Sequence, residues 1–154
     1  MTSEKYPYSI HKLTAVQGME EVVQIWMEGS KTAHAFIEPS YWLQHVAAMR
    51  EVYLPQSEVW VYKGSSGRIA GFVSLVESHL AALFIHPDQQ GRGIGSKLIQ
   101  WAKELKDALH LTVYAKNTRA VTFYQQHHFE IKWQQIDVNT GEVEFYMEWL
   151  KAKG

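Results

Sequence analysis

The segment that most constrains the fold lies in the middle of the chain, where an apolar run leads through a glycine-rich turn into an amphipathic helix. Residues 80–85 are continuously apolar and stop at His86-Pro87-Asp88, which predicts a central strand covered on both faces. Glycines follow at positions 91, 93 and 95, and apolar residues then recur at helical spacing from Ile94 to Leu105. Because glycines let backbone approach a ligand and a helix start carries unpaired N–H groups, this order predicts an anion-binding cradle.

The spacing of the glycines narrows the class of anion. A phosphate-binding P-loop requires Gly-Lys-Ser/Thr, whereas the order here is Gly95-Ser96-Lys97, so a P-loop is rejected. The dinucleotide fingerprint Gly-x-Gly-x-x-Gly is one residue longer than Gly91-x-Gly93-x-Gly95. The spacing that does fit is Gln90-x-x-Gly93-x-Gly95, with Arg92 as an additional positive charge.

The rest of the chain alternates between helical and extended periodicity. Apolar residues from Met19 predict a first helix that ends at Gly29, and a second helix follows Pro39 and ends at Leu54-Pro55. Strands are expected at 58–63, 69–76, 80–85 and 110–115, a short helix after Asn117-Thr118, and two closing strands around residues 139–141. The predicted fold class is α/β, with a central mixed sheet, helices on both faces, the order β-α-α-β-β-β-α-β-α-β-β, and a single domain over residues 1–154.

Composition excludes several classes of function. The chain has 154 residues, 46% hydrophobic and 20% charged, with a net charge of −1, so we expect no nucleic-acid partner. It contains no cysteine, and its eight histidines form no His-x-x-x-His pair, so we expect no metal site. Residues 1–6 lack the apolar core of a signal peptide and no stretch suits a membrane span, so we expect a cytoplasmic protein without membrane contact.

Two segments together resemble a known family. The sequence Gln90-Gly-Arg-Gly93-Ile-Gly95 resembles the Gln/Arg-x-x-Gly-x-Gly/Ala signature of the GNAT superfamily of acyl-CoA-dependent N-acetyltransferases. The segment from Asn117 to Phe129 resembles that superfamily's second segment, an Asn followed by a short helix with a Phe-Tyr pair and a Gly-Phe, except that His128 replaces the Gly. The resemblance covers about residues 58–150, and both motifs fall in the expected elements, so a merely structural tight turn is rejected.

The resemblance implies a fold, a cosubstrate and a set of residues that bind it. It implies a mostly antiparallel sheet of about seven strands and acetyl-CoA as cosubstrate, with no metal. A bulge in the fourth strand would free a backbone N–H for the thioester carbonyl. The implied cofactor-binding residues are Leu83, Phe84 and Ile85 on that strand, Gln90, Gly91, Arg92, Gly93, Ile94, Gly95 and Ser96 in the cradle, and Asn117.

Catalytic and acceptor residues are less sharply indicated. Tyr124 occupies the position of the family's usual general acid, although its spacing alone is also typical of a core aromatic residue. Glu77 and His79 lie between the third and fourth strands, where the family often places a base or a water relay; each alone is also typical of a solvated surface. Glu142, Glu144 and Glu148 are interpreted as the polar face of the last strand. Acceptor contacts are expected from Trp26, His34, Phe36 and Tyr41.

The acceptor itself stays open at this point. The chain resembles small bacterial enzymes that acetylate protein lysines by direct attack in a ternary complex. The alternatives are a small-molecule amine, such as a polyamine, an aminoglycoside or an amino acid, and a non-catalytic acyl-CoA-binding module that has lost transfer. The chain is expected to be a monomer or a homodimer.

Overall fold

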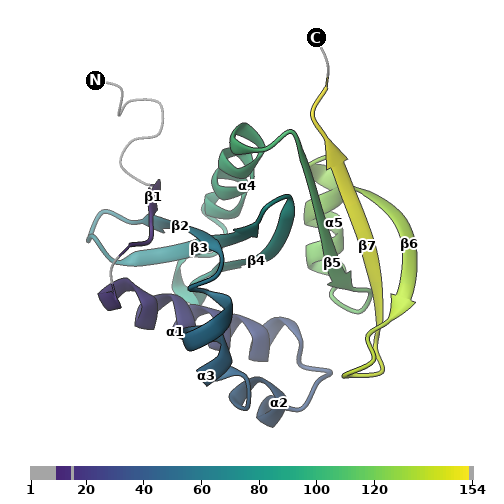
Figure 1. Cartoon of the computed structure of the whole chain (residues 1–154), viewed down its shortest axis with the longest axis horizontal. Helices are drawn as coiled ribbons and strands as arrows, with labels where there is room; N and C mark the ends of the chain where they lie inside the picture. The colour runs from purple at the N-terminus through teal and green to yellow at the C-terminus, as the bar shows by residue number, and fades with distance from the viewer. Residues whose placement is uncertain (1–9, 15, 153–154) are drawn as a thin grey trace.

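The computed structural model describes residues 10–14 and 16–152, with the side chains of residues 16 and 17 left aside (Figure 1). The elements follow one another in the predicted order: β1 (Ile10–Lys12), α1 (Val16–Ala33), α2 (Pro39–Leu43), α3 (Val46–Ala48), a π-helical turn (Met49–Tyr53), β2 (Glu58–Lys63), β3 (Ile69–Val76), β4 (His79–Ile85), a 3₁₀ turn (Pro87–Gln89), α4 (Ile94–Leu105), β5 (Ala108–Tyr114), α5 (Thr118–Gln126), β6 (Glu130–Ile136) and β7 (Val143–Leu150).

The seven strands form one sheet in the order β1-β2-β3-β4-β5-β7-β6. Every neighbouring pair is antiparallel except β4 and β5, which are parallel. This confirms the predicted mixed, mostly antiparallel sheet. The parallel pair has a single register partner, His79 with His110, and Figure 1 shows the two strands diverging beyond it. The sheet is therefore open in its middle.

Helices cover both faces of the sheet, as predicted, because alternate side chains of each strand point to opposite sides. On β2, Val59 and Val61 pack into the buried cluster of α1 and α2, whereas Trp60 and Tyr62 pack against the cluster of α4 and α5. The second cluster also holds Met147 of β7, so α4 and α5 share one continuous core behind the sheet.

The predicted end of the first helix was wrong, whereas the second helical segment keeps its predicted start and end but is not continuous. Helix α1 continues past Gly29 to Ala33. Gly29 is not a helix stop but leaves room for a neighbouring ring, since a Cβ there would lie 2.4 Å from Cδ1 of Phe84. The second helix is broken into α2, α3 and the π-helical turn. At the first break, Nδ1–H of His45 donates to the carbonyl of Tyr41 (2.6 Å), the acceptor that an unbroken helix would give to the His45 backbone N–H.

Strand β4 is central and packed on both faces, as predicted: Leu83 and Ile85 pack against the cluster of α4 and α5, and Phe84 against the cluster of α1 and α2. Leu80 is its one fully buried residue and Ala81 is exposed, because β4 lines the opening between itself and β5. Its register against β3 also shifts here: Ser74 pairs with Ala82 and Leu75 with Leu80, so Ala81 is the extra residue of a β-bulge.

Candidate active site

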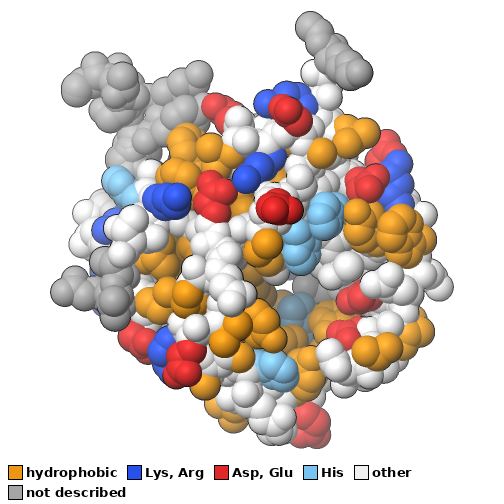
Figure 2. Space-filling model, viewed as in Figure 1, with side chains coloured by type: hydrophobic (Ala, Val, Ile, Leu, Met, Phe, Trp, Pro, Cys, Tyr) orange, Lys and Arg blue, Asp and Glu red, His pale blue; other side chains and the backbone are white. Residues whose placement is uncertain are grey.

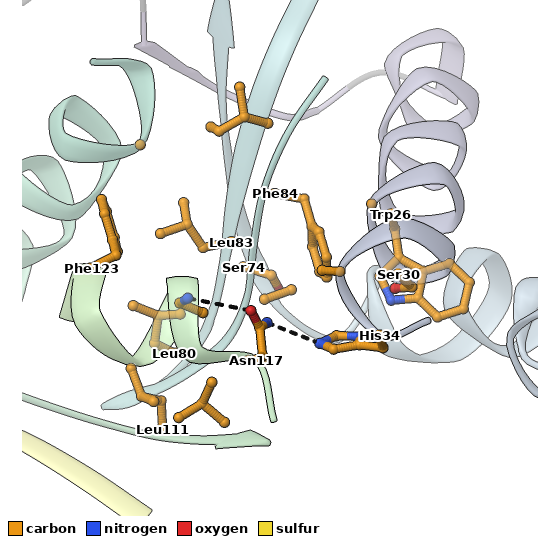
Figure 3. A pocket seen from close by; sticks show the side chains of 18 of the residues that line it. Trp26, Ser30, His34, Ser74, Leu80, Leu83, Phe84, Leu111, Asn117 and Phe123 are labelled. Carbon is orange, nitrogen blue, oxygen red and sulfur yellow. Dashed lines mark hydrogen bonds between the residues drawn. The ribbon is translucent and has the colours of Figure 1, made fainter. Parts of the chain in front are cut away.

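A large cleft follows the opening between β4 and β5. Its volume is about 1190 Å³, and its walls come from α1, β4, the 89–96 loop, β5, α5 and β7. In the space-filling view it forms the hollow near the centre of the molecule (Figure 2), and Figure 3 shows its walls from close by. No cluster of three or more potential metal ligands occurs within the part of the chain that the structure describes.

The edge of β4 presents free backbone groups to this cleft. His86 N–H bonds to Ala70 O of β3 at 2.7 Å, and in an antiparallel ladder every second residue bonds to the same neighbour. By this alternation Phe84 bonds to β3, while the N–H and C=O groups of Leu83 and Ile85 point to the cleft. The side-chain amide of Gln90 donates to Ile85 O at 3.3 Å, in agreement with this orientation.

The predicted bulge and the predicted donor residues are thus neighbours along one strand. The bulge lies at Ala81, two residues before Leu83, and it marks the point from which β4 runs alone along the cleft. Of the three residues named from the sequence, Leu83 and Ile85 offer backbone donors. Phe84 contributes its ring, which packs against His34 at 6.4 Å between centroids.

The glycine-rich loop has the backbone of an anion cradle. Gly91 and Gly93 have φ values of 80° and 78°, in the left-handed region that favours glycine, and Gly93 is the N-cap of α4. A Cβ at either position would meet nothing within 4 Å, so the space beside both glycines is open. The first turn of α4 brings its unpaired N–H groups to the same place. These features fit a pyrophosphate.

The flanking residues of the loop have different roles from one another. Arg92 is exposed, which leaves its charge available to a ligand. Gly95 packs against α5, since a Cβ there would lie 3.4 Å from Cζ of Phe123, and Ile94 is buried in the core. Ser96 Oγ lies 3.0 Å from Nε2 of His127, so this predicted ligand residue already has a partner.

Tyr124 lies on α5 between the core and the cleft. Its side chain is only 8% exposed, yet it lines the cavity. Burial raises the pKa of its hydroxyl, which is therefore protonated at neutral pH. Within the described part of the chain the hydroxyl has no hydrogen-bond partner, whereas the ring packs against Phe123 and Phe129. A protonated, unpartnered donor at a cleft wall is suited to donate a proton to a ligand.

Asn117 and His34 connect the two sides of the cleft (Figure 3). Asn117 caps α5, because its Oδ1 accepts from the Ala120 N–H at 3.3 Å, which orients its Nδ2 toward Nε2 of His34 at 3.3 Å. His34 is packed among aromatic rings, and burial lowers its pKa to about 4, so the ring is neutral at pH 7. A neutral ring that accepts at Nε2 carries its proton on Nδ1, which is buried and has no hydrogen-bond partner among the residues that the structure describes.

Of the predicted acceptor residues, Trp26 and His34 line the cleft, whereas Phe36 and Tyr41 do not line it and pack against residues that do. Phe36 packs edge-on to His34 and Tyr114, with centroids 5.9 and 5.6 Å apart. Tyr41 stacks edge-on to Trp42 at 5.0 Å, and burial raises the pKa of its hydroxyl. Trp26 reaches the cavity but is 7% exposed, so most of its indole belongs to the core of α1.

The two predicted base candidates are separated by the structure. Glu77 lies in the β3–β4 turn with φ at 55°, is exposed, and does not line the cleft. His79 does line it and stacks on His110, with ring centroids 5.0 Å apart and an interplanar angle of 9°. Burial and the neighbouring His110 lower the pKa of His79, so its ring is neutral at pH 7 and able to accept a proton.

Three cleft residues were missed by the sequence analysis. Tyr114, at the end of β5, donates from its hydroxyl to Oδ2 of Asp137 at 2.5 Å, and Glu144 of β7 pairs in register with Tyr114. All three line the cleft at the acceptor end. Glu144 was assigned to a polar strand face, which is correct locally; that face reaches the cleft because β7 lies directly beside β5.

Comparisons of the sequence and of the structure with known proteins agree with one another. The sequence profile of the acetyltransferase (GNAT) domain matches residues 55–131. The chain is 37% identical over 111 residues to the peptidyl-lysine N-acetyltransferase YiaC of Escherichia coli K12, covering 71% of this chain and 75% of that protein. The solution structure of apo YjaB from Escherichia coli superposes with a TM-score of 0.81 at 27% identity, covering 94% and 98% of the two chains.

A second solved structure shares the fold alone. The PaiA N-acetyltransferase of Thermoplasma acidophilum, determined in complex with coenzyme A, has a TM-score of 0.73 at 17% identity and covers 92% of this chain and 99% of its own. Together with the matches above, the splayed mixed sheet with an anion cradle beside the splay indicates an acyl-CoA-dependent transferase. The chain belongs to the GNAT family of acetyltransferases: it is an N-acetyltransferase with acetyl-CoA as its cosubstrate and an amine as its acceptor.

None of the helices within residues 10–14 and 16–152 has the length and hydropathy that a membrane span requires.

Proposed function

We propose that this enzyme is a peptidyl-lysine N-acetyltransferase, which transfers the acetyl group of acetyl-CoA to the ε-amine of a protein lysine by direct attack in a ternary complex. The observation that carries the proposal is the 37% identity to a relative named for this activity, over three quarters of that relative's length. The geometry supports it, because the cleft continues past the cradle to a second end with aromatic and acidic walls.

The chain's own groups divide the work of binding acetyl-CoA, which when bound supplies an activated thioester. The pyrophosphate would rest on the backbone of Gly91 and Gly93 and on the start of α4, with Arg92 adding its charge. The pantetheine amides would pair with the free edge of β4 at Leu83 and Ile85. One of these two N–H groups would donate to the thioester carbonyl oxygen and stabilise the negative charge that develops on it.

Two side chains would move protons. A free lysine amine has a pKa of about 10.4 and must lose a proton before it can attack. His79, neutral and in the cleft wall, would accept that proton directly or through water. As the new N–C bond forms and the C–S bond breaks, Tyr124 would donate its hydroxyl proton to the departing sulfur.

The acceptor end suits a lysine side chain. Trp42 and Tyr114, which line the cleft and pack against Tyr41 and Phe36, would supply apolar surface for its four-carbon stem. The carboxylates of Asp137 and Glu144 would attract its ammonium group on entry. Asp137 also lies close to Tyr41, whose raised pKa includes a contribution from its negative charge. Attack on the thioester would thus come from the end opposite the cradle.

The test is a thiol-release assay with acetyl-CoA against lysine-containing peptides, polyamines, aminoglycosides and free amino acids, followed by mass spectrometry of the peptides. We expect peptide lysines to give the highest kcat/KM and to gain an acetyl group. Tyr41→Ala removes the ring that packs against Trp42 of the cleft wall, so it should raise the peptide KM and leave the Kd for CoA unchanged. A small amine preferred over every peptide by tenfold or more would refute the proposal and assign the chain to small-molecule acetylation.

A further inference from the structure

A row of stacked rings crosses the sheet face that α5 leaves uncovered. Trp133 of β6 stacks on Tyr146 of β7, with centroids 4.0 Å apart and an angle of 3°, and Tyr146 stacks on His110 of β5 at 5.6 Å. His110 in turn stacks on His79, which lines the cleft. The row therefore connects an exposed tryptophan, 50% accessible, with the wall of the active-site cleft.

This face is open because the helix of this half lies on the other side. Tyr124 and Phe129 pack with Leu111 and Met147 in the core behind β5 and β7, and Figure 1 shows α5 behind those strands. In the strand register, Tyr146 of β7 pairs with Trp133 of β6 on one side and with Thr112 of β5 on the other. Figure 2 shows this face toward the viewer, with histidine side chains between the central hollow and hydrophobic side chains.

The charge of this face is negative. Glu144 accepts from the amide of Gln135 at 2.7 Å, and Glu148 accepts from the Tyr146 hydroxyl at 3.2 Å, so both carboxylates have neutral partners. Within the described residues neither forms an ion pair with Lys or Arg. Glu130, the register partner of Glu148, is the exception on this face, because Lys132 neutralises it at 3.1 Å.

We propose that this surface, formed by Trp133, Glu144, Tyr146, Glu148 and His110, is where the acceptor protein docks: it binds an extended segment that carries a basic residue close to the target lysine. The inference rests on the proposed function. Charge complementarity favours a basic segment, and the continuity of the surface with the cleft at Glu144 and His79 favours the acceptor over an unrelated partner.

The distance between the cleft and Glu148 sets the position of the basic residue. From β4 to β7 there are two strand spacings, or about 10 Å, and an extended chain advances by about 3.3 Å per residue. A Lys or Arg about three positions from the target lysine would therefore reach Glu148. The exposed ring of Trp133 would pack against the stem of the basic side chain or against its cation.

The experiment compares three peptides that share one target lysine and carry Arg, Gln or Glu three positions away, on either side. For the wild-type enzyme we expect the Arg peptide to exceed the Glu peptide about tenfold in kcat/KM, mainly through KM, and the difference to shrink at high salt. Glu148→Lys should reverse the order, and Trp133→Ala should lower kcat/KM for the Arg peptide about fivefold. Nα-acetyl-lysine amide, which has a free ε-amine but no neighbouring residues, should react equally with all variants.

Ile136→Ala is the matched control, because Ile136 is also exposed on β6 but shares the opposite face with Val143. It should behave as wild type with every peptide. Melting temperature and CoA affinity, measured for each variant, confirm that the fold and the cleft are intact. The inference is overturned if the wild type treats Arg and Glu peptides alike, or if Glu148→Lys retains the wild-type order.

Two further outcomes separate this inference from its alternatives. If no lysine substrate is acetylated while another amine is, the proposed function fails, and the docking surface falls with it. If sedimentation shows a dimer that Trp133→Ala dissociates, the face joins two copies of the chain, which also overturns the docking of an acceptor segment.

Discussion

Replacing Tyr124 with phenylalanine should slow the enzyme and at the same time leave it more stable. The substitution removes one hydroxyl from a side chain that is 8% exposed and has no hydrogen-bond partner within the described part of the chain. A desolvated hydroxyl without a partner destabilises the fold, so its loss should raise the free energy of unfolding by up to about 1 kcal/mol. For a chain of this length that is a rise of about 2–4 °C in Tm.

The effect on turnover should have the opposite sign. A positioned general acid contributes about 10²–10⁴-fold, or roughly 3–5 kcal/mol of barrier. Because the departing thiolate has a reference pKa of about 8.5 and leaves readily, the low end, about 10²-fold in kcat, is expected for Tyr124→Phe. The Kd for acetyl-CoA should hardly change, since the ring and its contacts with Phe123 and Phe129 persist.

The assay combines calorimetric binding of acetyl-CoA, thermal unfolding, and single-turnover kinetics, which isolate the chemical step from product release. Tyr62→Phe is a suitable control, because Tyr62 is a partly buried tyrosine that packs on the α4 side of β2 and does not line the cleft. If Tyr124→Phe retained a single-turnover rate within twofold of wild type, Tyr124 would be a core residue and the proton would come from water.

The other predictions concern the cradle, the α1–β4 contact and pH. Gly93→Glu should weaken CoA binding by calorimetry at least tenfold, whereas Gly67→Glu, with an equally positive φ in the distant β2–β3 turn, should not; equal affinities would contradict the cradle. Gly29→Ala should lower the urea-unfolding free energy by about 1–3 kcal/mol, since its Cβ would lie 2.4 Å from a ring carbon, while Gly64→Ala in open space should stay near wild type. His34 has a pKa lowered to about 4, so the unfolded chain binds more protons than the folded chain between pH 4 and 6.5. The free energy of unfolding should therefore fall by at most about 3 kcal/mol as the pH drops through that window. If His34→Gln showed the same pH profile as wild type, His34 would not be the cause of the loss.

The parts of the site that the sequence predicts well are those encoded by neighbouring residues. The cradle depends on the spacing from Gln90 to Gly95, and the cap of α5 depends on Asn117 and the N–H three residues later. Both are local, so pattern and structure agree. Strands β2 and β3 likewise match to the residue, because a short turn fixes their pairing.

The parts that escaped prediction depend on contacts between distant segments. Gly29 does not end α1 because Phe84, 55 positions later, needs the space that a missing Cβ leaves. Asp137 and Glu144 reach the cleft only because β7 inserts between β5 and β6, an order that strand periodicity does not specify. The break at His45 is different: it arises from a side chain that takes a helix carbonyl, which hydrophobic spacing does not detect.

The splay between β4 and β5 determines where each reacting group enters. If the parallel pairing continued beyond His79 and His110, β5 would occupy the N–H groups of Leu83 and Ile85, and β4 would have no edge for an acyl carrier. The other edge of β5 stays fully paired with β7, up to Tyr114 opposite Glu144, so opening the sheet leaves that half intact. The same pairing brings a carboxylate to the far end of the cleft. Backbone donors in the middle, a protonated tyrosine on one wall and acidic groups at the far end therefore follow from a single interruption of the ladder, and they define the direction from which an amine approaches.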